Sequence, residues 1–170
     1  MVAWRASSVQ SSRRIRVRGT DLIGLLQRVS QASVLVEGET IAAIGEGLLV
    51  MVGIEHGDGV VQAGRLLERL LAYRVFPDAE GRMNHDVREV GGSVLLVPQF
   101  TLAADTRKGN RPGFSRAADP SVGQTLFERL VELGQNGRVP VVAGRFGVTM
   151  QVNLSNEGPV TFWLRVSPDG

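Results

Sequence analysis

The residues with the most distinctive chemistry lie near the C-terminus, in residues 155–161, where Gly158 precedes Pro159. An X-Pro bond is the only kind of peptide bond that adopts the cis form at low cost, about 0.5–1 kcal/mol. A Gly-Pro pair can also present bare backbone carbonyls to a ligand, because glycine has no side chain and proline has no N–H. Asn, Gly and Pro between two strands are equally typical of a connecting turn. The local sequence leaves both interpretations open.

The side chains that most often carry catalysis are scarce. The chain has no cysteine, which excludes a thiol nucleophile, a thiolate metal site and a disulfide framework. His56 and His85 fall in predicted loops without metal-ligand spacing to a partner, so we expect surface histidines, no metal and no cofactor. Asp105 and Asp119 are candidate paired carboxylates, but nothing in the sequence brings them together. Nucleophile-elbow and Walker motifs are absent.

Residues 105–115 form a polar and basic stretch that contains Arg107, Lys108 and Arg111 among glycines and a proline. Such a composition is typical of a solvated loop. It also fits a loop that contacts the phosphates of a nucleic acid. The sequence does not decide between these two interpretations.

The elements that must position these residues follow from the spacing of apolar side chains. Alternating or continuous apolar runs predict strands over residues 22–29, 32–36, 40–44, 48–54, 93–97, 139–143, 148–154 and 162–166. Helical spacing predicts one helix opening at residues 57–59 and another opening at residues 119–121. Pro98 ends the strand before it, so residues 99–102 follow the end of that strand, where sites commonly form. We therefore expect one α/β domain whose helices cover a strongly curved or double sheet.

Composition and charge separate a terminal segment from this domain. The chain has 170 residues, 43% hydrophobic and 21% charged, which is typical of one soluble globular domain. Residues 1–20 contain five arginines and no acid, giving +5, whereas the rest has 14 basic and 17 acidic residues, giving −3; together they make the total of +2. We expect residues 1–21 to be a disordered basic extension and residues 22–168 to be the domain. A transit peptide and an upstream start codon remain alternatives for the extension.

Four stretches of the predicted domain together resemble the D-aminoacyl-tRNA deacylase family. They are residues 25–30 (LLQRVS), 99–107 (QFTLAADTR), 144–147 (GRFG) with 150–152 (MQV), and 156–161 (NEGPVT). The resemblance is colinear from about residue 22 to residue 166. Leu22 falls where members of the family usually begin, which supports treating the preceding residues as an extension.

The resemblance implies a fold, a reaction and a set of partners. The implied fold is a homodimer of single α/β domains in β/β/α layers, with strongly curved, mainly antiparallel or mixed sheets and two main helices. The implied reaction is hydrolysis of the ester between a D-amino acid, or glycine, and the terminal ribose of tRNA. The implied partner is the 3′ end of aminoacyl-tRNA, without DNA, a membrane or a cofactor. We expect a cytoplasmic location, or an organelle if residues 1–21 act as a transit peptide.

The resemblance also assigns catalysis to Gln99, Phe100 and Thr101. An aminoacyl ester is already activated, so positioning supplies much of the acceleration and a side-chain base is not essential. Backbone N–H groups around Phe100 and Thr101 would stabilise the developing oxyanion, and the 2′-hydroxyl of the substrate would take the place of a side-chain base. We therefore expect Thr101 to position the substrate rather than to form an acyl-enzyme.

Chiral selection is assigned by the resemblance to Gly158 and Pro159, joined by a cis bond and reaching into the site of the partner subunit. Arg28 would hold that segment in place, and Met150 would contribute to substrate binding. Rigid Gly158 and Pro159 carbonyls would occupy the space that an L side chain needs, which rejects L-amino acids and accepts D-amino acids of many sizes. Such a filter cannot reject glycine.

Pro98 departs from the family pattern, which usually has serine at this position. A related animal-type group carries proline there, with a trans Gly-Pro bond and a relaxed specificity that admits a small L-aminoacyl-tRNA. That group typically lacks the equivalents of Arg28 and Phe100, and this chain keeps both. We therefore predict a D-specific deacylase. The alternatives are a relaxed-specificity deacylase and a tRNA-binding dimer that has lost catalysis.

Overall fold

The computed structural model describes residues 21–168, and nearly all of the predicted N-terminal extension, residues 1–21, lies outside them. The elements in chain order are β1 (Leu22–Val36), β2 (Glu39–Ile44), β3 (Gly47–Gly53), α1 (Val60–Ala72), β4 (Phe76–Pro77), β5 (Met83–His85), β6 (Ser93–Pro98), a 3-10 helix η1 (Phe100–Ala103), α2 (Pro120–Gln135), β7 (Val141–Ala143) and β8 (Gln151–Val166). None of the helices in the described part of the chain is long and apolar enough to cross a bilayer.

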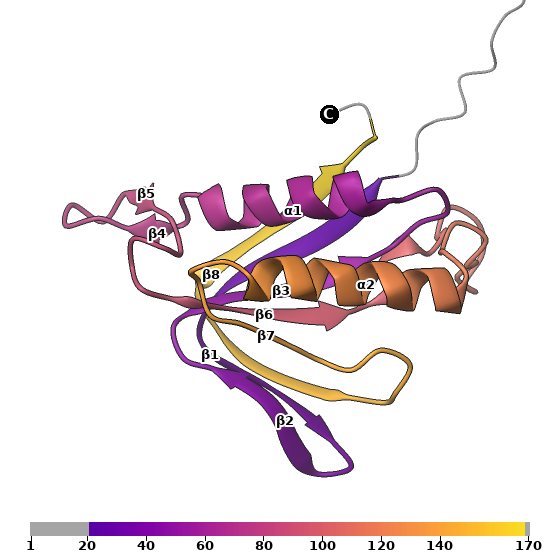
Figure 1. Cartoon of the computed structure of the whole chain (residues 1–170), viewed down its shortest axis with the longest axis horizontal. Helices are drawn as coiled ribbons and strands as arrows, with labels where there is room; N and C mark the ends of the chain where they lie inside the picture. Colours follow the sequence, from indigo (N-terminus) through magenta and orange to yellow (C-terminus); the bar gives the residue numbers. More distant parts are fainter. Residues whose placement is uncertain (1–20, 169–170) are drawn as a thin grey trace, which may run out of the picture.

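The strands and helices form three layers. The main sheet has the order β2-β1-β3-β6-β7, with β8 paired to β1, and β4 pairs with β5 separately. β3 pairs with β6 and β6 with β7 in parallel, while the other pairs are antiparallel. Figure 1 shows α1 and α2 side by side on one face of the sheet, and the β1–β2 hairpin with the start of β8 on the other. The predicted β/β/α fold with two main helices is confirmed.

Two hydrophobic cores lie on the two faces of β3 and β6. Leu48 and Val50 of β3 pack toward the helices, whereas Leu49 packs toward the β1–β2 hairpin. In β6, Leu96 packs in the core on the helix side and Leu95 packs in the core on the hairpin side. Because both faces of these parallel strands are buried, the strands are continuously apolar instead of alternating. The continuous apolar runs in the sequence therefore correctly predicted two central strands.

β1 is one strand of 15 residues, and the prediction of two strands over residues 22–29 and 32–36 was wrong. On β8 the partner of Val29 is Asn156 and the partner of Gln31 is Ser155, so β1 carries one extra residue, Ser30. Such a bulge reverses which side chains face inward. Ala32 therefore faces the same core as Val29 although the two lie three residues apart. The polar residues at the bulge resemble a strand end in the sequence.

Both predicted helices are present, each with an apolar face. α1 buries Ala63, Leu66, Leu67 and Leu70 against the sheet, and it opens with a capping bond from the Gly59 N–H to the Gln62 side chain. α2 begins at Pro120, a favoured first position because its missing N–H has no partner within the helix.

The remaining differences from prediction concern strand ends and short elements. β7 begins at Val141 rather than residue 139, because Pro140 cannot donate to the ladder. β8 begins at Gln151 rather than residue 148, after a turn in which Gly147 has a φ of +77°. His85 lies at the end of β5 instead of in a loop. Residues 100–103, directly after the end of β6, form the short helix η1, which the apolar spacing did not predict.

Close packing of β3 against β6 depends on one glycine. A Cβ atom at Gly47 would lie 1.9 Å from the carbonyl oxygen of Ser93, the residue paired with Gly47 in the parallel ladder. Only a residue without a side chain fits there. This contact fixes the start of β6, and therefore also the position of the residues that follow its end.

Candidate substrate site

The end of β6 presents the first group of predicted site residues. Pro98 is the last residue of β6, and the N–H of Gln99 donates to the Val52 carbonyl at 2.7 Å. η1 follows at once, so Phe100 and Thr101 form its first turn. The Gln99 side-chain amide donates to the Thr101 hydroxyl. Phe100 is 56% exposed, which leaves it available to a ligand.

A pocket of ≈ 550 Å³ opens beside this strand end. It is lined by Val97, Pro98, Gln99, Phe100, Ala118, Pro120, Phe146, Gly147, Val148, Thr149, Met150 and Val152. Its walls are mostly apolar, with few polar side chains, which is typical of a small-molecule site. The structure therefore brings Gln99, Phe100 and Met150 together around one cavity. Thr101 lies next to it but is not part of the lining.

Met150 is held in this pocket by the turn that precedes it. Its sulfur accepts the N–H of Arg145 at 3.3 Å. A Cβ atom at Gly144 would lie 2.9 Å from the Met150 sulfur and 3.5 Å from the Pro98 ring, so this glycine allows both side chains to approach the turn. Phe146 completes the wall and packs on Phe127 of α2, with ring centroids 6.5 Å apart.

The aromatic ring of Phe114, which the sequence analysis did not single out, packs against Phe100. Their ring centroids are 5.1 Å apart and their planes are inclined by 51°. Phe114 is 42% exposed and does not line the pocket itself. It therefore extends the aromatic surface outward from the pocket mouth. In the sequence, Phe114 is distinguished only by being an aromatic residue in a basic stretch.

The Gly-Pro segment, residues 157–160, lies opposite Arg28 in the pairing of β8 with β1. Thr161 pairs with Gln27 and Asn156 pairs with Val29, so the four residues 157–160 bulge out against the single residue Arg28. The chain does not reverse, because both sides of the segment pair with β1 in the same direction. The interpretation as a connecting turn between two strands was therefore wrong. The Gly158–Pro159 bond is cis, and both residues are exposed.

Side chains of β1 and β8 fix the Gly-Pro segment. The Arg28 guanidinium donates from Nε to the Glu157 carbonyl at 2.9 Å and from Nη1 to the Val75 carbonyl at 2.6 Å. Asn156 accepts the Val160 N–H at 2.7 Å and donates to the Val160 carbonyl at 3.2 Å. The same amide group also lies within bonding distance of the side chains of Thr161 and Gln27. Sequence reasoning found Arg28 but missed Asn156.

The two groups of predicted residues are separate within one chain. Arg28 lines a second cavity of ≈ 500 Å³, together with Val29, Ser30, Glu46, Phe76, Pro77 and Glu157. Neither Gly158 nor Pro159 lines the pocket that contains Gln99, Phe100 and Met150. A single copy of residues 21–168 therefore does not bring the Gly-Pro segment to the catalytic segment.

The candidate carboxylates serve structure. Asp105 binds Arg107 through Nε at 2.8 Å and Nη2 at 2.6 Å, and this guanidinium holds the pKa of the Asp105 carboxyl well below its usual range. Asp119 caps α2, where its carbonyl accepts the Gly123 N–H at 2.8 Å. The Asp105 carboxylate is thus bound by Arg107, whereas Asp119 contributes its backbone carbonyl to the helix cap and its side chain makes no capping hydrogen bond. Among residues 21–168 there is no cluster of three or more histidine and acidic side chains that could hold a metal ion.

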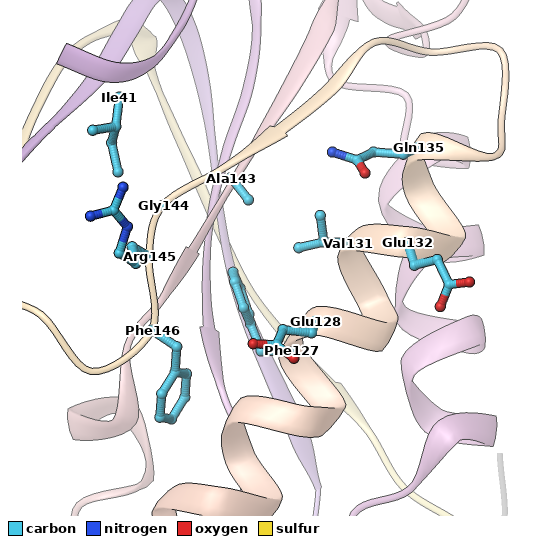
Figure 2. Close-up of a pocket in the computed structure, with 10 residues that line it drawn as sticks. All are labelled: Ile41, Phe127, Glu128, Val131, Glu132, Gln135, Ala143, Gly144, Arg145 and Phe146. Carbon is cyan, nitrogen blue, oxygen red and sulfur yellow. The ribbon is translucent and has the colours of Figure 1, made fainter.

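Another cavity, of ≈ 350 Å³, lies between α2 and the segment after β7. Figure 2 shows Glu128, Val131, Glu132 and Gln135 of α2 on one side, with Arg145 and Phe146 on the other. It contains none of the predicted site residues, and two carboxylates lie on its helix side. Glu132 is paired with Arg129 at 2.6 Å. This cavity offers no match to the expected chemistry, so the pocket at the end of β6 is the candidate site.

Comparisons with known proteins agree with this geometry. The family model described as D-Tyr-tRNA(Tyr) deacylase matches residues 25–165. The D-aminoacyl-tRNA deacylase of Methylococcus capsulatus is 59% identical over 148 residues, which are 87% of this chain and 97% of that protein. The D-aminoacyl-tRNA deacylase of Alkalilimnicola ehrlichii is 57% identical over 147 residues, which are 86% of this chain and 98% of that protein.

A solved structure also resembles this chain over most of its length. The structure of c-Myc DNA Unwinding Element Binding Protein superposes with a TM-score of 0.79 at 35% identity, covering 84% of this chain and 97% of that chain. Residues 25–165, which the family model matches, include both the Gln99–Met150 pocket and the Gly-Pro segment. The chain belongs to the D-Tyr-tRNA(Tyr) deacylase family.

Proposed function

We propose that this protein hydrolyses the ester of D-aminoacyl-tRNA to a free D-amino acid and tRNA, and thereby removes D-amino acids from translation. The observation that carries the proposal is the anchored Gly-Pro segment, with Arg28 bonded to the Glu157 carbonyl, in a chain of this family. The pocket beside Gln99 has the size and mostly apolar walls that suit an aminoacyl group.

Catalysis in this proposal relies on backbone groups and on the substrate. The first N–H groups of a helix have no acceptor within it, and in η1 these belong to Phe100 and Thr101. They are suited to stabilise the oxyanion that forms when water attacks the ester carbonyl. The 2′-hydroxyl of the terminal ribose serves as the proton acceptor in place of a side chain. Thr101→Ala is then expected to keep substantial activity, and a trapped acyl-enzyme in the wild type would contradict this mechanism.

Chiral selection in this proposal is steric. The exposed Gly158 and Pro159 present backbone atoms where the side chain of an L-amino acid would point, and Arg28 with Asn156 keeps these atoms from yielding. Glycine has no side chain to exclude, so glycyl-tRNA is also expected to be cleaved. Resistance of a glycyl substrate would count against a steric filter.

The complete site requires a second copy of the chain in this proposal. The Gly-Pro segment is exposed, and it does not line the pocket of its own chain. In addition, β8 pairs only with β1 among the described strands, and Trp163 of β8 is 50% exposed. A homodimer in which each Gly-Pro segment enters the pocket of the partner would use both features.

Subunit mixing tests the shared site. Gly158→Ala damages the filter segment, and Phe100→Ala damages the pocket. A mixed dimer of the two variants would still contain one intact pocket facing one intact Gly-Pro segment. Random mixing should restore about a quarter of the wild-type activity, because half of the dimers are mixed and each has one of two sites intact. Activity no higher than the mean of the parents would contradict the shared site.

A second candidate function rests on Pro98, which stands where the family usually has serine. A deacylase of relaxed specificity would also cleave L-alanyl-tRNA, and a tRNA-binding dimer without catalysis would cleave no ester. Retention of Arg28 and Phe100 favours the D-specific enzyme. We further propose a cytoplasmic location and no DNA partner.

The first test is a deacylation time course on D-tyrosyl-tRNA and L-tyrosyl-tRNA in parallel, followed by L-alanyl-tRNA. Loss of the D ester with both L esters spared is the expected result. Hydrolysis of L-alanyl-tRNA would favour the relaxed-specificity enzyme. Hydrolysis of none of them would leave the tRNA-binding dimer.

A further inference from the structure

A loop beside the candidate pocket concentrates positive charge on a domain that is otherwise acidic. Arg107, Lys108 and Arg111 are exposed, and residues 106–118 contain no acidic residue. Residues 21–170 as a whole carry 14 basic and 17 acidic residues, a formal charge of −3. A polyanion is therefore repelled by the domain on average and attracted locally by this loop.

The basic loop, residues 105–113, has a fixed shape at its base. The N–H of Asp105 donates to the Gly113 carbonyl at 2.7 Å, and the N–H of Gly113 donates back to the Asp105 carbonyl at 3.0 Å. The Asp105 carboxylate in addition aligns Arg107 through two short bonds. Lys108 and Arg111 make no hydrogen bond or ion pair within residues 21–168, so their charges face solvent. The fixed base of the loop therefore presents two free cations, Lys108 and Arg111.

The chain after the loop is tied to the sheet beside the pocket. Glu55, two residues after the end of β3, is 1% exposed and accepts a hydrogen bond from Arg116 Nη2 at 2.9 Å. The N–H of Ala118, which lines the pocket, donates to the Ile54 carbonyl at 3.0 Å. These contacts hold the basic loop at the pocket instead of leaving it free to swing away.

Aromatic rings lie between the pocket and the basic loop. Phe100 lines the pocket, and Phe114, which directly follows the loop, packs on Phe100 without lining the pocket itself. A positively charged surface combined with exposed aromatic side chains is the arrangement that binds single-stranded nucleic acid, because the cations contact phosphates and the rings stack on bases. The 3′ end of tRNA is single-stranded next to the ester.

We propose that Lys108 and Arg111 bind phosphates of the single-stranded 3′ end of tRNA, and that Phe114 stacks on a base preceding the terminal adenosine. This assignment rests on the proposed function, because it supplies the tRNA contact for the same site. It accounts for the position of the free cations beyond the pocket and for the exposure of Phe114.

The test compares two substrates of one reaction. D-Tyrosyl-tRNA contains the phosphates and bases, whereas D-tyrosyl-adenosine contains only the terminal nucleoside. The double variant Lys108→Ala/Arg111→Ala is expected to raise KM for the tRNA about tenfold with kcat unchanged. Its plot of log(kcat/KM) against log salt should be less steep by about 1.4, at about 0.7 for each lost contact to a single strand. Activity on D-tyrosyl-adenosine should equal that of the wild type.

A matched control removes the same charge elsewhere. Arg82 and Arg138 are both exposed, and Arg138 follows the far end of α2, about 24 Å from its start at 1.5 Å per residue. Arg82→Ala/Arg138→Ala should leave KM for the tRNA unchanged. An equal rise in KM for this control would overturn the proposal. An equal loss of activity on both substrates in Lys108→Ala/Arg111→Ala would also overturn it. If the wild type cleaves neither substrate, the proposed function fails first.

Phe114 is tested by the same comparison. Phe114→Leu keeps an apolar side chain but removes the stacking ring, and it should reduce kcat/KM on the tRNA about tenfold. Phe114→Tyr should restore it, and neither variant should change activity on D-tyrosyl-adenosine. Equal loss on both substrates would show that Phe114 acts only by supporting Phe100, and would overturn its role in stacking.

Lys108 permits a direct footprint, because it is the only lysine in the sequence. Acetylation of Lys108 can be measured by mass spectrometry with and without a tRNA that carries D-tyrosine through an amide in place of the ester. The proposal expects protection of Lys108 by this tRNA. Unchanged acetylation of Lys108 at saturating tRNA would overturn it.

Discussion

The Gly-Pro segment and the basic loop are both held in place by their own chain, but by different forces. Arg28 and Asn156 fix the Gly-Pro segment through hydrogen bonds to backbone groups. The basic loop and the chain after it are aligned by two ion pairs, Asp105 with Arg107 and Glu55 with Arg116. Backbone acceptors do not titrate, whereas carboxylates do, and exposed ion pairs weaken with salt.

This difference suits the two proposed tasks. A steric filter must hold its atoms to within a fraction of an ångström under all conditions. Hydrogen bonds from side chains to backbone groups provide this rigidity. A phosphate-binding loop needs exposed charge, which it cannot have without sensitivity to salt. We therefore expect substitutions at the Gly-Pro segment to change selectivity independently of salt. Substitutions at the basic loop should change tRNA affinity in a salt-dependent way.

The largest effect is expected for Gly158→Ala. Gly158 has a φ of +135°, and a Cβ atom there would lie 2.8 Å from the Val160 side chain and 3.1 Å from the Arg28 guanidinium. The segment must shift, and a displacement of about 1 Å at a site costs roughly 100-fold in rate. We expect kcat/KM on D-tyrosyl-tRNA to fall by about this factor.

Gly81→Ala is the control for Gly158→Ala, because Gly81 has a φ of +77° but no atom within 4 Å of a Cβ. It should lower the free energy of unfolding by about 1 kcal/mol from backbone strain and leave kcat/KM unchanged. Wild-type activity of Gly158→Ala would show that the segment is not held as tightly as its contacts indicate.

Arg28→Ala is expected to have the next largest effect. It removes the bonds to the Glu157 and Val75 carbonyls and should lower the free energy of unfolding by about 2 kcal/mol. The freed segment should admit L-tyrosyl-tRNA, so the ratio of D to L hydrolysis should fall. Arg28→Lys should be intermediate, because lysine cannot reach both carbonyls with a planar fork. An unchanged ratio in Arg28→Ala would assign Arg28 to stability alone.

Most of the fold could be predicted from the sequence, because its signals are local. The spacing of apolar residues in α1 and α2, and the continuous apolar runs of β3 and β6, each report burial directly. The bulge at Ser30 could not be predicted, because it is defined by pairing with β8, more than 100 residues away. β4 and β5, of two and three residues, are too short to show a period.

The candidate site was predictable only where a residue type is unusual. Gly158-Pro159 stands out by its backbone chemistry, and the resemblance supplied Arg28 and the segment that begins at Gln99. Asn156 and Phe114 are ordinary residue types in ordinary surroundings. Their roles depend on contacts that the chain makes only after folding: an amide bonded to Val160, and a ring packed on Phe100.

A smaller effect is expected for Glu55→Gln, which keeps the shape of the buried side chain but removes its charge. The loss of the ion pair with Arg116, which is about half exposed, should lower the free energy of unfolding by about 1 kcal/mol in 0.1 M salt. This difference should shrink only in part in 1 M salt, where the Debye length is about 3 Å, because salt screens the half-exposed Arg116 but reaches the buried Glu55 carboxylate much less. Denaturant titrations at both salt concentrations measure it. The loss of unfolding free energy in Arg28→Ala should be the same at both salt concentrations. If it shrank in 1 M salt as much as the loss in Glu55→Gln, the contrast between the two regions would disappear.

The smallest effect is expected from the pH dependence of Asp105→Asn. The pKa of folded Asp105 is lowered by Arg107 below the value of about 3.9 for an unfolded chain, so folding favours the ionised carboxylate. Above about pH 5 both states are ionised and the contribution of the ion pair to stability is complete. As the pH falls further, the unfolded state takes up its proton first, and the contribution declines until the folded carboxyl is also protonated. The difference in urea midpoint between the wild type and Asp105→Asn should therefore be constant from pH 8 to about pH 5 and shrink below about pH 4. A difference that already shrinks between pH 7 and pH 5 would mean that Arg107 does not hold the carboxylate, and that the basic loop is not aligned by this pair.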